Sequence, residues 1–271
     1  MKIYPTFDAA FKDSVKRLLA LGHTLQPNNW QSVDVSQRKE AETHELLNWS
    51  IQVPMRGTDL LLYQEDLKPN LPWADDHFLQ ERVSGHPKNP GTTWKSWPWG
   101  LSADKFRTEG QAFSHSYAER YWPRFAGRTP GGILEPKDRV DSIKGVRYPY
   151  GDLDDVIARL HQDPLTRQAV LSVWFPEDAH NGGQRVPCSL FYHFIQRGGY
   201  LHMVYTIRSC DALRHFRDDI YLSVRLLLWV LEQLRDSSPD VWNSVVPATF
   251  TMHITSLHCF TGDLKALGKL T

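Results

Sequence analysis

Apolar side chains recur along the chain at spacings that alternate between those of helices and those of strands. Residues 6–22 carry them every three or four positions and end at a glycine, which predicts an amphipathic helix. A shorter stretch of the same kind covers residues 152–162. Residues 219–235 are apolar nearly all round, which is typical of a helix buried in the middle of a protein.

Runs rich in β-branched and aromatic residues predict strands at residues 45–53, 168–175 and 248–260. Two more runs, SLFYHFIQ and YLHMVYTI, lie on either side of Gly198-Gly199, and a glycine pair in that position predicts a β-hairpin. The fold class that follows is α+β, with a mostly antiparallel or mixed sheet packed on one long buried helix.

The stretch 65–112 is rich in proline, glycine and tryptophan, and we expect short helices joined by long loops there. Its tryptophans, Trp94, Trp97 and Trp99 among them, either pack these loops together or form a surface for a flat aromatic ligand. The chain shows no internal repeat, low-complexity segment or linker, so residues 1–271 are expected to form a single domain.

Composition narrows the functional classes. The formal net charge is zero, so no global field favours nucleic acid or an anionic membrane. The three cysteines, Cys188, Cys210 and Cys259, form no CxxC pair, which argues against a disulfide framework and against a metal site of the zinc type. No apolar run approaches the ~18–20 residues that span a bilayer, and the N-terminus lacks a signal-like stretch. We therefore expect a cytoplasmic protein, of a bacterium or a phage-infected host cell, with free thiols.

One cysteine stands in a chemically suggestive place. Cys188 follows a proline and precedes the predicted hairpin, and Arg208-Ser-Cys-Asp211 follows that hairpin. A lone cysteine before an apolar strand is more often a small core residue. The order Pro-Cys, hairpin, Arg-Ser-Cys-Asp and buried helix, with twenty residues from cysteine to arginine, resembles the thymidylate synthase family and its relative, the phage deoxycytidylate hydroxymethylase. The resemblance is closest over residues 150–260.

The resemblance implies a thymidylate-synthase-like fold whose sheet forms a homodimer interface. It also implies a reaction in which 5,10-methylenetetrahydrofolate supplies a one-carbon unit to C5 of a pyrimidine nucleoside monophosphate. Cys188 would be the catalytic nucleophile, because thiolate addition at C6 makes C5 nucleophilic. Neighbouring arginines are expected to lower the pKa of this thiol, and the other two cysteines are interpreted as structural.

Further site residues follow from the same resemblance. Arg208 and Ser209 match the phosphate ligands of the family, and Arg167 matches an arginine lent across the dimer interface. The second arginine of that pair is replaced here by Gln168. Asp211 resembles the ligand of the pterin ring. For each arginine, the alternative is a solvated surface charge, although a guanidinium fork suits phosphate.

Asp219 stands where the uracil enzymes of the family carry asparagine, eleven residues after Arg208. Uracil offers N3–H as a donor and O4 as an acceptor, whereas cytosine offers N3 as an acceptor and its 4-amino group as a donor. A protonated carboxyl matches cytosine, as does a carboxylate facing cytosine protonated at N3. The competing interpretation is a helix cap, a role that Asp218 can also fill.

Glu81 and Tyr117 are 36 residues apart, the same separation as the catalytic glutamate and an active-site tyrosine of the family. The glutamate would organise water and move protons, and the tyrosine would lie near C5. A salt bridge to Arg82 is the alternative for Glu81, and Glu65 is the second candidate for the catalytic glutamate.

His253 is matched to the family histidine that hydrogen-bonds the sugar, while the tyrosine two residues further on is Thr255 here. His258 is interpreted as an ordinary strand histidine. Only thirteen residues follow it, too few for the C-terminal segment that closes the family's site. Closure excludes water, so its absence favours water as the final acceptor.

The sequence thus predicts 5-hydroxymethylation of dCMP or CMP. Two alternatives within the same chemistry stay open, namely C5-methylation of a cytosine nucleotide and a uracil-specific methyltransferase. A third alternative is a nucleotide-binding module that has kept the fold and lost turnover.

Overall fold

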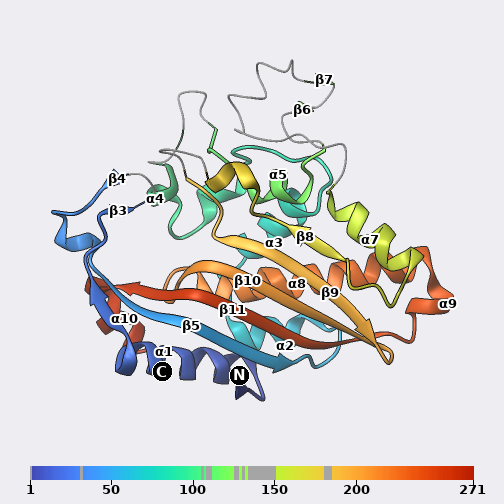
Figure 1. The fold of residues 1–271 in the computed structure, drawn as a ribbon, viewed down its shortest axis with the longest axis horizontal. Helices are drawn as coiled ribbons and strands as arrows, with labels where there is room; N and C mark the ends of the chain where they lie inside the picture. Colours follow the sequence, from blue (N-terminus) through green and yellow to red (C-terminus); the bar gives the residue numbers. More distant parts are fainter. Residues whose placement is uncertain are drawn as a thin grey trace.

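A seven-stranded mixed sheet runs through the computed structural model, which describes residues 2–30, 33–104, 107, 112–124, 128–129, 132–133, 151–179 and 185–271 (Figure 1). In spatial order the strands are β1 (Lys2–Ile3), β5 (Thr43–Pro54), β11 (Val246–Phe260), β10 (Tyr200–Asp211), β9 (Ser189–Arg197) and β8 (Val170–Ser172), with β2 (His23–Leu25) paired to β5. Two small hairpins lie apart: β3 (Asn29–Trp30) with β4 (Val33–Asp34), and β6 (Arg128–Thr129) with β7 (Gly132–Ile133).

In the view of Figure 1, one long helix lies behind the sheet, several shorter helices lie above it, and the N-terminal and C-terminal helices lie at its lower left. The longer ones are α1 (Phe7–Leu21), α2 (Leu60–Leu67), α7 (Leu153–Gln162) and α8 (Phe216–Ser237). The shorter ones are α3 (Trp73–His77), α4 (Gly100–Asp104), α5 (Tyr117–Tyr121), α9 (Pro239–Trp242) and α10 (Leu264–Gly268). Single turns cover Lys39–Ala41, Phe78–Arg82, Thr93–Ser96, Pro176–Ala179 and Thr261–Asp263. The stretch 65–112 therefore consists of short helices and loops, as expected, although residues 105–106 and 108–111 lie outside the described part.

The sheet is mixed because α8 connects two neighbouring strands. Strand β10 leads into α8, and the chain returns as β11 beside β10 and parallel to it, since such a return needs a crossover. The β10–β9, β9–β8 and β11–β5 pairs are antiparallel. The predicted α+β class, a mixed sheet on a long buried helix, is confirmed.

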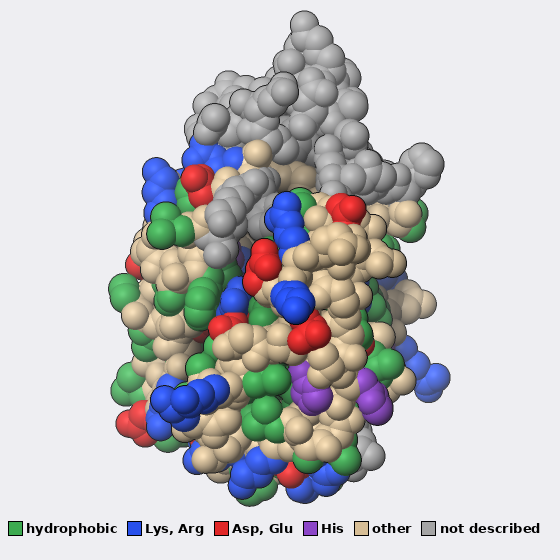
Figure 2. Space-filling model, turned by 90° about the vertical axis from the view of Figure 1, so that its left-hand side faces the viewer, with side chains coloured by type: hydrophobic (Ala, Val, Ile, Leu, Met, Phe, Trp, Pro, Cys, Tyr) green, Lys and Arg blue, Asp and Glu red, His purple; other side chains and the backbone are tan. Residues whose placement is uncertain are grey.

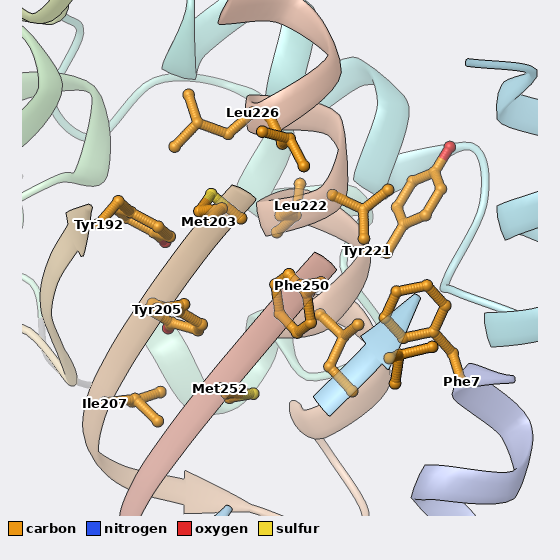
Figure 3. Close-up of a cluster of buried hydrophobic side chains, with 14 of the residues drawn as sticks. Phe7, Tyr192, Met203, Tyr205, Ile207, Tyr221, Leu222, Leu226, Phe250 and Met252 are labelled. Atoms are coloured by element: carbon orange, nitrogen blue, oxygen red, sulfur yellow. The ribbon is translucent and has the colours of Figure 1, made fainter. Parts of the chain in front are cut away.

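The core lies between α8 and the sheet, and Figure 3 shows its centre. The rings of Tyr192 and Tyr205 stack across β9 and β10 at 4.6 Å between centroids. Phe7 of α1 meets Phe250 of β11 edge to face at 5.6 Å. Such aromatic pairs add about 0.5–1.5 kcal/mol each beyond the free energy of burying their surface. Leu222 and Leu226 of α8 belong to the same buried cluster (Figure 3), so the core fixes α8 on the sheet, and with it the helix's first turn.

Two local details depend on backbone geometry. Gly198 and Gly199 both have positive φ angles, 58° and 82°, which a two-residue hairpin turn with the right twist requires. Strand β8 covers only 170–172, shorter than the predicted 168–175. The amides of Val173 and Trp174 both donate to the carbonyl of Leu190, so the regular pairing with β9 ends there.

Basic, acidic and hydrophobic side chains are interspersed over the face in Figure 2, in keeping with the zero net charge. None of the helices in the described ranges combines the length and the apolar character needed to cross a bilayer.

Candidate active site

A cavity of about 250 Å³ opens where the ends of β10 and β11 meet α3, α5 and the first turn of α8. Five residues singled out from the sequence line it: Tyr117, Cys188, Ser209, Asp211 and Asp219. The remaining lining is largely aromatic and basic, and includes Trp73, Trp97, Trp99, His77, His115, His215, His258, Arg82, Arg185 and Arg214. Four other predicted site residues do not line the cavity in the part of the chain that the structure describes, namely Arg208, Arg167, Glu81 and His253.

Cys188 stands immediately before β9, and its carbonyl accepts the backbone N–H of Arg208 at 2.9 Å. Burial raises the pKa of its thiol above the ordinary value. The cations of Arg208 and Arg185 lower this pKa and the carboxyl of Asp219 raises it, but burial dominates. The expectation that arginines would lower the pKa thus meets a stronger opposing effect. Without substrate, the group is a thiol, and its proton must leave when sulfur attacks.

Arg208 holds the turn that carries this cysteine. Its Nε donates to the carbonyl of Pro187 at 3.0 Å, and its Nη2 donates to that of Val186 at 3.2 Å. Its guanidinium also lies 5.7 Å from the ring centre of Trp174. These contacts engage Nε and Nη2 of Arg208 at the cavity's edge, whereas Arg185 and Ser209 form part of its lining.

Arg167 lies on the surface just before β8, where its carbonyl accepts Nε2 of His193 at 3.0 Å. Gln168, in the place of the family's second arginine, accepts Nη1 of Arg159 at 2.9 Å. Neither side chain reaches the cavity of its own subunit, so a role for Arg167 in phosphate binding requires a second copy of the chain.

The N-terminus of α8 presents Asp219 to the cavity. The residue at the cap position is His215, which makes no side-chain cap, so neither aspartate caps the helix. Asp218 instead accepts the backbone N–H and the Nδ2 of Asn70, at 2.9 and 2.7 Å. Asp219 lies one position further on, where its Oδ2 accepts the S–H of Cys210 at 3.6 Å. The helix-cap interpretation of both residues is therefore wrong.

Burial raises the pKa of Asp219 to about 7. The cation of Arg82 opposes this shift, the carboxyl of Asp218 adds to it, and the hydrogen bond from Cys210 opposes it. Because a carboxyl with this pKa exists in both forms near neutral pH, Asp219 can donate as well as accept. That property is what recognition of an unprotonated cytosine requires.

Glu81 lies behind the cavity wall, buried, and organises a loop. Its Oε1 accepts the backbone N–H groups of Thr92 and Thr93 at 2.8 and 2.9 Å, and its Oε2 lies 2.8 Å from Nδ1 of His77. Burial favours the neutral acid, but the hydrogen bonds from His77 and Thr93 outweigh it and lower the pKa of Glu81 to about 2. A carboxylate held ionised in this way is a weak proton acceptor.

His77 connects Glu81 to the cavity. The Nε of Arg82 donates to Nε2 of His77 at 3.0 Å, which leaves the imidazole proton on Nδ1, facing Glu81. The ring of His77 stacks on Trp73 at 5.2 Å, with 9° between their planes. Burial lowers the pKa of this histidine, although the hydrogen bond with Glu81 raises it. Glu81 therefore reaches the site through a neutral imidazole.

We expect Glu81→Gln to lower the free energy of unfolding by about 1–3 kcal/mol. An amide oxygen can still accept from the Thr92 and Thr93 backbone, but the NH₂ group then faces Nδ1–H of His77. If His77 carried its proton on Nε2 instead, that N–H would face the N–H of Arg82, so two donors would again oppose each other. Urea denaturation of variant and wild type measures the change.

The matched control is Glu65→Gln, since Glu65 is exposed on α2 and lies outside the cavity. It should change stability by less than about 0.5 kcal/mol. Equal stability of Glu81→Gln and wild type would contradict the role of Glu81 in holding the loop.

Tyr117 opens α5, and its hydroxyl lies 3.4 Å from the backbone N and 3.3 Å from the Oγ of Ser189. Burial raises the pKa of this phenol, and the nearby sulfur of Cys188 raises it further, so Tyr117 is a neutral donor. The helix is fastened by Arg120, whose two Nη atoms bind the carboxylate of Asp178 at 2.8 and 2.9 Å. Both partners of this pair are buried.

The histidine that β11 brings to the cavity is His258, not His253. Successive side chains on a strand point to opposite faces, so residues five apart cannot share one face in a regular strand. His253 faces away from α8, where its Nδ1 lies 2.9 Å from Oγ of Ser50 on β5. His258 and Phe260 share the parity of the core residue Met252, a signal in the sequence that could have identified them.

Several residues that line the cavity belong to no sequence motif that could have indicated their position. His115 and His215 line the cavity, and burial lowers the pKa of both, that of His215 to about 4. They are therefore neutral near pH 7 and can accept or donate hydrogen bonds. No group of three or more His, Cys, Asp or Glu in the described ranges has an arrangement that could hold a metal ion.

The aromatic side of the cavity fits a flat heterocycle. Trp73, Trp97 and Trp99 line it, whereas Trp94 packs edge to face on Phe113. The indole N–H of Trp73 is buried and has no hydrogen-bond acceptor within the described residues. A polar ligand that supplied one would remove the cost of burying this donor.

Asp211 turns the chain from β10 towards α8. Its Oδ1 accepts the backbone N–H groups of Leu213 and Arg214 at 2.9 and 3.0 Å. The carboxyl lies on the cavity wall, so the same side chain shapes the turn and faces the ligand space.

Comparisons with known proteins identify the family and the fold. A family model described as thymidylate synthase matches residues 86–266. A putative thymidylate synthase of Methanosarcina barkeri (strain Fusaro / DSM 804) is 25% identical over 134 residues, which are 45% of this chain and 57% of that relative. The thermostable thymidylate synthase A from Bacillus subtilis matches in structure with a TM-score of 0.67 at 14% identity, over 98% of this chain and 83% of that chain. The fold is thymidylate-synthase-like, as the resemblance implied.

Proposed function

Because this chain belongs to the thymidylate synthase family, we propose that it transfers a one-carbon unit to C5 of a cytidine monophosphate nucleotide, dCMP or CMP. The product we favour is the 5-hydroxymethyl nucleotide. The observation that carries this proposal is Asp219, a half-buried carboxyl with a pKa of about 7 in the same cavity as Cys188. Residues 1–271 would act as one domain.

The reaction begins at Cys188. Its thiol loses a proton as Sγ adds to C6 of the base, and the electrons of the C5–C6 double bond make C5 a nucleophile. When bound, 5,10-methylenetetrahydrofolate would supply the methylene carbon that C5 attacks. Loss of the proton from C5, together with cleavage of the bond from that carbon to the folate nitrogen and departure of tetrahydrofolate, would leave an exocyclic methylene group on the base. Water then adds its oxygen to that group, and the bond from Sγ to C6 breaks to release the product.

Each cavity residue has a task in this scheme. Below pH 7, the neutral carboxyl of Asp219 donates to N3 and accepts from the 4-amino group. Tyr117, a neutral phenol beside Cys188, holds the water that takes the proton from C5. Arg185 and Ser209 bind the phosphate together with Arg167 of the partner subunit, while Arg208 acts indirectly by fixing the turn before Cys188.

The folate would lie against the aromatic wall. Trp97 and Trp99 would cover the faces of its pterin, and the unpartnered N–H of Trp73 would find an acceptor there. Asp211 would accept from the polar edge of the ring. Glu81 takes part only by holding His77.

Water is the acceptor we favour because the cavity is lined by groups that bind it. The histidines His77, His115 and His215 are neutral near pH 7, since burial lowers the pKa of each. Methylation by hydride transfer is the alternative, and it needs water to be excluded. Mass analysis of the product from dCMP, CMP, dUMP and UMP decides between them, because the two products differ by one oxygen atom. A 5-methyl product would overturn the hydroxymethyl assignment and leave the cytosine assignment intact.

A nucleotide-binding module without turnover is the second candidate, and the raised pKa of the Cys188 thiol favours it. In that case dCMP would bind, and C5–H would never exchange with solvent. Binding measured by calorimetry together with exchange measured by isotope release separates the two functions.

We also expect the protein to be a homodimer that pairs through the open face of its sheet. Phe191, Ile195 and Val204 are half-buried on the face away from α8, and no helix of the described residues covers this face (Figure 1). Mixing inactive Arg167→Ala with inactive Cys188→Ser should restore roughly a quarter of wild-type activity, since half of the dimers would then contain one intact site. A fully active monomer in sedimentation would contradict this expectation.

A further inference from the structure

The thiol of Cys210 donates a hydrogen bond to the carboxyl of Asp219. Cys210 is the penultimate residue of β10, the strand that leads into α8, and is 1% exposed. Its Sγ is 3.6 Å from Oδ2 of Asp219, while the next acceptor, the carbonyl of Asp211, is 4.0 Å away. Burial, reinforced by the charges of Asp219 and Asp211, raises the pKa of this thiol well above its usual value. Cys210 is therefore a permanent donor.

We propose that Cys210 is a specificity-determining residue, whose S–H holds Oδ2 of Asp219 as an acceptor and so assigns the carboxyl proton to Oδ1. This inference rests on the proposed function, because it explains how that site selects cytosine. Cys210 touches Asp219 and not the base, so it acts as a positioning residue. Nothing in the motif Arg-Ser-Cys-Asp assigns such a role to its cysteine.

The consequence for base choice follows from donor and acceptor matching. A neutral carboxyl has one O–H donor and one carbonyl acceptor, and it can exchange them by moving its proton. With Oδ2 held by Cys210, Oδ1–H donates to N3 of cytosine and Oδ2 accepts from the 4-amino group. The carbonyl oxygen has two lone pairs, so it can accept from the base and from the thiol together.

Uracil needs the opposite arrangement. Its N3–H requires an acceptor at Oδ1, and its O4 requires a donor at Oδ2. A proton on Oδ2 would compete with the S–H of Cys210 for the same side of that oxygen, and the buried thiol would lose its acceptor. The wild-type protein thus rejects uracil partly through a residue that makes no contact with it.

The test is the ratio of kcat/KM for dCMP to kcat/KM for dUMP. Cys210→Ala removes the donor, so the carboxyl can adopt either proton arrangement, and the ratio should fall about two- to tenfold. Cys210→Ser returns an O–H donor at the same position and should recover at least half of the lost preference. The matched control is Cys259→Ala, because Cys259 is equally buried but donates to the carbonyl of Phe260 and not to Asp219.

Cys259→Ala should keep the wild-type ratio, and melting temperatures ensure that every variant is assayed folded. If Cys210→Ala keeps a ratio within twofold of wild type, the role of Cys210 is overturned while the proposed function stands. A shift in Cys210→Ala that Cys210→Ser does not recover at all also overturns it, since packing and not the donor would then be responsible. If the wild-type protein does not prefer dCMP to dUMP, that result contradicts the proposed function itself, whatever the Cys210 variants show.

Discussion

Cys188→Ser is expected to lower kcat by at least on the order of a thousandfold while the Kd for dCMP stays within tenfold of wild type. A serine hydroxyl is a far weaker nucleophile than a thiol at neutral pH, and without the bond from residue 188 to C6 the base has no nucleophilic C5. The substitution replaces one sulfur by a smaller oxygen, so the cavity keeps its shape. Steady-state kinetics measures kcat, and titration calorimetry measures the Kd for dCMP.

Cys259→Ser is the control for this variant, because it makes the same chemical change in a thiol that lies outside the cavity. It should retain wild-type kcat. A Cys188→Ser protein with more than a few per cent of wild-type turnover would show that the reaction does not pass through this sulfur.

Asp219→Asn should shift preference from cytosine to uracil nucleotides. The NH₂ group of the asparagine can donate to O4 of uracil, and its oxygen can accept from N3–H. With cytosine, the same NH₂ group would face the 4-amino group, so two donors would oppose each other. Each mismatched buried group costs about 1–3 kcal/mol, and two groups change. The ratio of kcat/KM for dCMP to that for dUMP should therefore fall by about 10²- to 10⁴-fold.

The same residue predicts a pH dependence. Burial raises the pKa of Asp219 to about 7 from an ordinary value near 3.8, so the carboxyl is neutral below pH 7 and ionised above it. Arg82 and Cys210 act against this shift, and Asp218 and Asp211 support it. Turnover of dCMP should decline as pH rises through 7, because the ionised group no longer donates to N3.

Asp219→Asn should lack this decline in whatever activity it retains, since an amide does not titrate. The comparison is a pH profile of kcat/KM from pH 6 to 9 for both proteins. A wild type that prefers dUMP, or a variant whose ratio does not move towards uracil, would contradict the role of Asp219 in base choice.

Elements with a strong local signal could be predicted from the sequence. The hairpin followed from two β-rich runs around Gly198-Gly199, whose positive φ angles suit glycine. The long helix followed from apolar residues on nearly all its sides, and α8 is indeed buried along most of its length. Cys188 and Asp219 were found because their spacing from Arg208 is set by the hairpin and the turn into α8, which lie within one continuous stretch of chain.

Residues whose role depends on a face or on a distant contact could not be placed in this way. Arg208 has the family's spacing, but its guanidinium is committed to the carbonyls of Val186 and Pro187. The spacing of Glu81 said nothing about the backbone of Thr92 and Thr93, which captures its carboxylate. In each case the deciding contact comes from a segment that only the folded chain brings near.

For β11 the motif match pointed to the wrong face of the strand. His253 was matched to the sugar-binding histidine on the last strand of the family, whereas the alternation of side chains selects His258 as the residue that lines the cavity. The pattern of core residues on β11, such as Phe250 and Met252, was the better guide. When site residues lie on a strand, the alternation of buried side chains should therefore be considered together with motif spacing, because it shows which residues share one face.

The most direct measurement for the central claim is release of tritium from C5 of [5-³H]dCMP and [5-³H]CMP into water. Exchange at C5 requires addition of Cys188 at C6, and product formation requires 5,10-methylenetetrahydrofolate as well. The account predicts tritium release from at least one of these nucleotides in step with formation of the 5-hydroxymethyl product, and none from Cys188→Ser. A wild-type protein that binds both nucleotides and leaves their tritium in place would contradict it.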